Sequence, residues 1–236
     1  MNLYELNQQL QKIYKEKLLS FLVFGSLSNQ DSKTLEKKVS TLMVLSDLNM
    51  EILELASDVL QKWCKQGNPE PLFFSPHHFQ DALDVFPLEY LDIKQRSKVL
   101  FGQHPLKEKA IPLGNLRHQC ETELRGKKLH LRSLFASHKN DKELLLNALM
   151  GSLSSILLSF RGILHLLGEK PEDKNKELIL QLAKCIECDP QIFLVLAECL
   201  ETGNTKQIKK ELRSTLHAYL TQLTTITRYV DTHSLT

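Results

Sequence analysis

The residues from Phe24 to Asn49 read FGSLSNQDSKTLEKKVSTLMVLSDLN, and the prediction of the fold starts from them. The segment begins where an apolar run, Ser20–Gly25, ends in glycine followed by serine. A polar segment comes next, and then a second run rich in β-branched and apolar residues, Val39–Leu45. Short runs of this kind are typical of buried strands. The sequence therefore predicts two strands, joined by a polar connection that opens with a Gly-Ser turn.

The segments on either side of this pair mix helices and short strands. An amphipathic helix is predicted over residues 3–19, because its leucines recur along one stripe. Ser46 or Asp47 is expected to cap a second helix, which ends at Gly67. A short helix is predicted over residues 77–83, and short strands over residues 71–74, 88–93 and 98–102.

After Pro112 the strong patterns are all helical. The expected helices cover residues 113–134, 141–167, 174–186, 190–201 and 206–229. The segment Gly102–Gly114 has the composition of a linker. The predicted fold class is therefore α+β, with a small mixed-sheet domain over residues 1–108 and an all-α helical bundle over residues 109–236.

The composition limits the partners and the compartment. The 236 residues carry a net charge of +2, which favours neither nucleic acid nor an acidic membrane as the main partner. The N-terminus lacks the pattern of a signal peptide, and the uncharged run Leu144–Phe160 is short for a bilayer span. Five scattered cysteines fit reduced thiols. A cytoplasmic protein is expected.

Three blocks of sequence, in order, resemble the nucleotidyltransferase-fold family. They are LVFGS at residues 22–26, PLFFSPHHFQDALDVFPLEYLDIKQRSKVLFG at residues 71–102, and LRHQCETELRGK at residues 116–127. Within that family the sequence is similar to the MNT and aminoglycoside nucleotidyltransferase domains, and to bacterial proteins that join such a domain to a helical bundle. Beyond about residue 140 the likeness is only helical character.

The resemblance implies a nucleotide site. In the family, the backbone amides and serine hydroxyl of the Gly-Ser turn hold nucleotide phosphates, which assigns this role to Gly25 and Ser26. Two carboxylates at alternate positions of the next strand hold Mg²⁺. An active member would therefore use Mg²⁺ together with ATP or another nucleoside triphosphate.

The paired carboxylates are missing from the expected positions. Asp47 and Asn49 follow the strand instead of entering it, and helix capping explains them better. Counting from Gly25 by the family's spacing places Lys38 and Ser40 where the carboxylates belong. An ammonium group does not bind Mg²⁺.

Residues near the turn suggest two ways in which the protein replaces the missing carboxylate pair. Glu36 and Asp92 are candidate replacement metal ligands, and Asp92 is also a candidate catalytic acid or an ion-paired partner of Lys94. Alternatively, Lys37 and Lys38 receive phosphate directly, or they belong to a solvated loop.

The helix after the linker carries further candidates. Glu121 or Glu123 is placed to serve as a catalytic base, although ion pairs with Arg125 and Lys127 explain them equally well. Arg125 and His130 also fit the loose Arg-to-His spacing of the HEPN ribonucleases, but both fall inside one helix.

These observations favour a catalytically degenerate nucleotidyltransferase-fold protein that binds nucleotide or phosphate at the Gly-Ser turn and acts by binding a partner. One alternative is an active Mg²⁺-dependent nucleotidyltransferase that uses the substitute acids. Another is a HEPN-like toxin or antitoxin module, or a dimerisation module. A homodimer or a protein partner is expected to use the helical domain.

Overall fold

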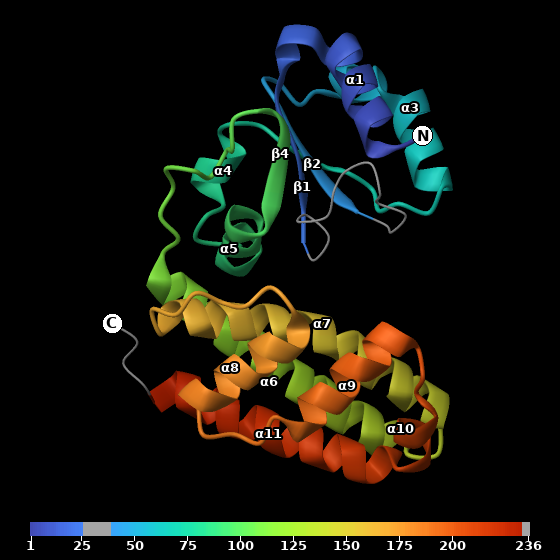
Figure 1. The fold of residues 1–236 in the computed structure, drawn as a ribbon, viewed down its shortest axis with the longest axis vertical. Coiled ribbons are helices and arrows are strands. Elements are labelled where there is room, and N and C mark those ends of the chain that lie inside the picture. The colour runs from blue at the N-terminus through green and yellow to red at the C-terminus, as the bar shows by residue number, and fades with distance from the viewer. Residues whose placement is uncertain (26–38, 233–236) are drawn as a thin grey trace. The chain divides into compact units, whose positions relative to one another are not determined.

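The computed structural model describes residues 1–25 and 39–232. The chain divides into two compact units, Met1–Pro112 and Leu113–Thr236. The first unit contains a sheet with helices around it, and the second is helical (Figure 1). The predicted α+β class is confirmed.

The sheet of the first unit has the strand order β3-β2-β1-β4. Strand β1 (Leu18–Phe24) is antiparallel to both β2 (Ser40–Leu45) and β4 (Ser97–Gly102), whereas β3 (Leu72–Phe74) is parallel to β2. The two central strands are buried almost throughout, because helices cover both faces of the sheet. This burial explains their continuous apolar runs.

The N-terminal helix is shorter than predicted. Helix α1 (Leu3–Tyr14) begins with a capping box between Asn2 and Glu5, and it ends at Lys15, which has a φ of 49°. A 3₁₀ turn, η1 (Lys15–Lys17), leads directly into β1. The residues at 18 and 19 that continue the helical stripe therefore belong to the sheet, where Leu18 pairs with Leu45.

One face of the sheet packs against α1 and α3 (Ser57–Lys65) (Figure 1). The core on this face is formed by alternate residues of β1 and β2 together with the apolar stripes of the helices: Leu3, Leu6, Leu10, Tyr14, Phe21, Val23, Met43, Leu45, Ile52 and Trp63. The alternation within the strands follows from the pleat of the sheet, which turns successive side chains to opposite faces.

The helix after β2 is capped by Asn49, not by Ser46 or Asp47. The side-chain oxygen of Asn49 accepts the N–H of Ile52 at 2.9 Å, and its amide donates to Asp47 at 2.9 Å. Helix α2 (Met50–Glu54) thus starts three residues later than a helix capped by Ser46 would. The interpretation of Asp47 and Asn49 as capping residues holds for Asn49, with Asp47 as its hydrogen-bond partner.

The strand predicted over residues 88–93 is wrong. These residues form helix α5 (Pro87–Gln95), after the short helix α4 (His78–Asp81). Pro87 occupies the first helical turn, where proline is well tolerated. The helix is buried on several sides, at Leu88, Tyr90, Leu91 and Ile93. Because the helix carries apolar residues on several sides, apolar and polar residues alternate along part of its sequence, as they do in a strand.

The second unit is built from long helices around α7. Its elements are α6 (Leu113–His138), α7 (Lys142–Leu166), α8 (Asn175–Cys185), α9 (Gln191–Thr202), α10 (Lys206–Lys210) and α11 (Leu212–Thr232). The helix predicted over residues 206–229 is interrupted at Glu211, where α10 gives way to α11. Helix α7 has the length and apolar character of a membrane span, but half of its most apolar window is buried inside the structure. That burial is the pattern of a bundle-core helix.

Candidate functional site

The described part of the predicted phosphate turn is Gly25, at the end of β1. Its φ is +90°, a conformation that favours glycine, and its N–H donates to the carbonyl oxygen of Arg96 at 3.0 Å. Phe24, the preceding residue, pairs with Ser40 on one side and with Ser97 on the other. The turn therefore leaves the sheet between the start of β2 and the start of β4.

Among the described residues, no atom lies within 4 Å of the place that a Cβ at Gly25 would take. Space next to the backbone is what a ligand needs to approach its amides. The other residues predicted at the turn, Ser26, Glu36, Lys37 and Lys38, lie outside the described residues. Their roles stay predictions.

Asp92 lies on α5, and its carboxylate is engaged by Arg96. Nη1 of Arg96 donates to Oδ1 of Asp92 at 2.9 Å, and the side chains are only 12% and 15% exposed, respectively. Lys94, the partner expected from strand alternation, donates to the carbonyl of Lys109 at 2.6 Å. The interpretation of Asp92 as an ion-paired carboxylate agrees with the structure, but the predicted partner was wrong.

Arg96 was not singled out in the sequence, although a signal for it existed. Asp92 and Arg96 are four residues apart, which is the spacing of ion pairs on a helix. Reading residues 88–93 as a strand concealed this spacing. The residue matters because its backbone carbonyl accepts the N–H of Gly25 while its guanidinium binds the carboxylate of Asp92.

His104 and Ser97 form a second polar contact at the start of β4. Nε2 of His104 lies 2.8 Å from Oγ of Ser97, and Nδ1 accepts the N–H of Leu106 at 3.0 Å. The pKa of His104 is lowered mainly because the ring is buried, and the charge of Lys94 acts in the same direction. A neutral ring with its proton on Nε2 satisfies both contacts, so this histidine braces the strand beside the turn.

Among the described residues, strand β2 brings no carboxylate to the turn. Its polar side chains at that end are the hydroxyl groups of Ser40 and Thr41, and Asp92 is bound by a guanidinium. Over residues 1–25 and 39–232, no group of three or more His, Cys, Asp and Glu side chains could hold a metal ion.

Glu121 and Glu123 lie on α6, in the second unit, with Arg125 and His130. Arg125 donates to Glu121 at 2.6 Å and to Asp231 at 3.2 Å, so the predicted pairing of Glu121 is observed. The guanidinium of Arg125 is thus bound by two carboxylates, and His130 is exposed on the same helix. This arrangement gives no support to a ribonuclease pair.

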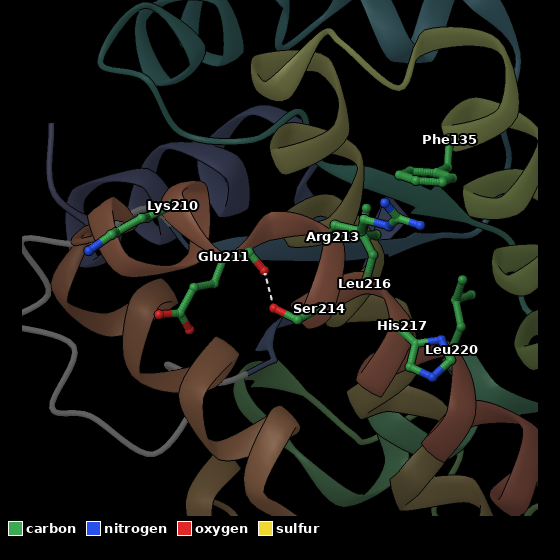
Figure 2. Close-up of a pocket in the computed structure, with 8 residues that line it drawn as sticks. All are labelled: Phe135, Lys210, Glu211, Arg213, Ser214, Leu216, His217 and Leu220. Atoms are coloured by element: carbon green, nitrogen blue, oxygen red, sulfur yellow. Dashed lines mark hydrogen bonds between the residues drawn. The ribbon is translucent and has the colours of Figure 1, made fainter.

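A pocket of about 780 Å³ opens between α6, α10 and α11 of the second unit (Figure 2). Its apolar wall contains Phe135, Leu216 and Leu220, and its polar residues are Lys210, Glu211, Arg213, Ser214 and His217. The hydroxyl of Ser214 donates to the carbonyl of Glu211 at 2.8 Å (Figure 2). None of the predicted site residues lines this pocket.

Comparison with known proteins gives a result at the level of the fold. No protein-family model matches the chain, and no curated protein sequence does. Among solved structures, the chain is similar to the spectinomycin adenyltransferase AAD(9) from Enterococcus faecialis, determined with ATP and spectinomycin. The TM-score is 0.56 at 13% identity, over 94% of this chain and all of that one. The fold is nucleotidyltransferase-like.

A second structure is a nucleotidyltransferase-like protein from Exiguobacterium sibiricum, with a TM-score of 0.39 at 12% identity, over 96% of this chain and 74% of that one. Only the likeness to the spectinomycin adenyltransferase carries an argument, and at 13% identity it shows the fold alone, so the activity has to be argued from the site.

Proposed function

We propose that this nucleotidyltransferase-fold protein binds the phosphates of a nucleotide at the Gly25-Ser26 turn and has lost the two-carboxylate metal site. In this proposal the protein is a binding module and not a transferase. Its nucleotide-bound form meets a protein partner, or a second copy of the chain, through the helical unit.

The observation that carries the proposal is the pairing of Phe24 with Ser40. It places a hydroxyl-bearing residue on β2 directly beside the turn, where an active member of the fold carries an acid. Because no residue of β2 is acidic, the strand brings no negative charge to hold a divalent metal.

The charges close to the turn also favour an anion. Lys37 and Lys38 precede β2 in the sequence, whereas the guanidinium of Arg96 is already neutralised by Asp92. Fixed cations attract phosphate oxygens without a metal. The ATP present in the structure of the spectinomycin adenyltransferase makes ATP the first nucleotide to test.

The test is a calorimetric titration of the full chain with ATP, in Mg²⁺ and again in EDTA. We expect a similar dissociation constant in both, since the phosphates meet cations of the protein. The double variant Lys37→Gln/Lys38→Gln should bind at least tenfold more weakly. Lys12→Gln, at an exposed lysine of α1, is the matched control and should bind as the parent does.

If the protein is instead an active nucleotidyltransferase, the results should differ. An active enzyme would transfer label from α-labelled ATP in Mg²⁺, and Glu36→Gln or Asp92→Asn would stop the transfer. Either that transfer, or nucleotide binding that disappears in EDTA, would contradict the proposal.

A further inference from the structure

Lys128 is a buried lysine in the middle of α6. Only 9% of it is exposed, and it lies between Leu124 and Leu131, which are fully buried. Over the described parts of the chain, no hydrogen bond or ion pair is formed by its ammonium group. Lysine is rarely buried without a partner, because its charge loses hydration.

In the described ranges, the charges that shift the pKa of this ammonium are all positive. Arg125 and Arg132 lie three residues before it and four residues after it, so they share its face of α6. Arg228 comes from α11, which packs antiparallel to α6. Arg117 of α6 helps to hold the two helices together, because it donates to the carbonyl of Val230 on α11 at 3.2 Å. Burial and these three charges lower the pKa of Lys128.

The nearby carboxylates do not compensate this charge. Glu121 and Asp231 are both bound to Arg125, which they hold at the edge of the cluster. Arg132 and Arg228 are exposed, so their guanidinium groups are accessible to a ligand from solvent. An anion bound among these cations would supply the negative charge that the buried ammonium lacks.

We propose that Lys128, Arg132 and Arg228 form an anion-binding site between α6 and α11, and that its ligand is a small dianion of the phosphate type. The site is compact, and Glu121 and Asp231 flank it, which disfavours an extended polyanion along the helices. Guanidinium and ammonium groups together suit phosphate oxygens. The site lies in the second unit and does not depend on the nucleotide turn of the first.

The experiment is equilibrium dialysis of the full chain against labelled inorganic phosphate, with chloride holding the ionic strength constant. We expect Lys128→Met to weaken phosphate binding at least tenfold, while its unbranched side chain keeps the apolar contacts of the lysine stem. Arg228→Gln, at an exposed position, should weaken binding several-fold without affecting folding. A parallel arm uses AMP: equal affinity identifies a phosphate monoester as the ligand, and binding of inorganic phosphate alone identifies the free ion.

Lys127→Gln is the matched control, because it removes one positive charge from the adjacent position of the same helix. It should bind phosphate as the parent does. The Lys37→Gln/Lys38→Gln variant should also keep this site, which separates it from the proposed nucleotide turn. Failure of phosphate to bind above the chloride background, unchanged binding by Lys128→Met, or an equal loss in Lys127→Gln would overturn the proposal.

Discussion

Asp92 and Arg96 form an ion pair of 2.9 Å within one turn of α5, and the pair is largely withdrawn from solvent. The same arginine accepts the N–H of Gly25 through its backbone carbonyl. A carboxylate that sequence reasoning offered as a metal ligand therefore neutralises the residue that holds the phosphate turn in place. The backbone of Arg96 thus joins the end of α5 to the end of β1, and Asp92 holds the side chain of the same residue.

Replacing Asp92 tests this role. We expect Asp92→Asn to lower the free energy of unfolding of the first unit by about 3 kcal/mol, because it leaves a nearly buried guanidinium without its counter-charge. Trp63, the only tryptophan and itself buried in this unit, reports unfolding by its fluorescence in urea. A double-mutant cycle with Arg96→Gln should show a coupling above about 1 kcal/mol. A coupling near zero would remove the structural role.

The stability of the first unit should depend on His104 below neutral pH. The pKa of His104 is lowered in the folded state, so the unfolded chain binds a proton more readily. Stability contributed by the neutral ring is present above the unfolded pKa of about 6.5 and is lost as the pH falls below it. Urea unfolding followed by Trp63 between pH 5 and pH 8 measures the loss. His104→Asn should flatten the curve, and an unchanged pH dependence would count against the assignment.

Gly102 is expected to tolerate no side chain. A Cβ there would lie 2.0 Å from the carbonyl oxygen of Leu19, and the φ of +74° is itself unfavourable for other residues. Gly102→Ala should destabilise the first unit by about 2 kcal/mol or more, as judged by Trp63 fluorescence.

Gly126 supplies the control for that substitution. It lies inside α6, where an added Cβ meets nothing within 4 Å. Gly126→Ala should stabilise its helix by up to about 1 kcal/mol. If both alanine variants behaved alike, the close approach of Leu19 and Gly102 would be in doubt.

In the second unit, Arg161 should contribute strongly to stability. It is 3% exposed and donates to the carbonyl oxygens of Glu172 at 2.6 Å and Asp173 at 2.7 Å, in the segment between α7 and α8. Arg161→Met would remove both of these hydrogen bonds from a buried group, at a cost of about 3 kcal/mol. Circular dichroism during urea unfolding measures it. Arg213→Met, at an exposed arginine, should change stability by less than about 0.5 kcal/mol.

Much of this fold was predictable because its patterns are local. The runs at residues 20–25 and 39–45 are too apolar and too short for helices, and both form strands close to the predicted ends. The helices of the second unit follow from stripes such as Leu116, Cys120, Leu124 and Leu131, which are all buried. In each case the local pattern and the tertiary burial agree.

The errors arose where burial removed the periodic signal. Helix α5 is covered on several sides, so apolar residues stand at every phase of its turn and imitate a strand. The charge cluster around Lys128 depends on Arg228, a hundred residues further along the chain, and no local pattern joins the two. Of the residues around the proposed nucleotide turn, Gly25 and Asp92 could be named from the sequence, but their connection through Arg96 required the tertiary structure.

The position of β1 between β2 and β4 has a consequence for how the chain folds during synthesis. One edge of β1 pairs with β2, which follows soon after it in the sequence. The other edge pairs with β4, Ser97–Gly102, which is synthesised much later. Non-local pairings of this kind slow folding and leave strand edges open in the meantime. On the ribosome, the first unit should stay incomplete, with one edge of β1 open to other chains, until Gly102 has left the exit tunnel. The α6–α7 hairpin that follows can close locally.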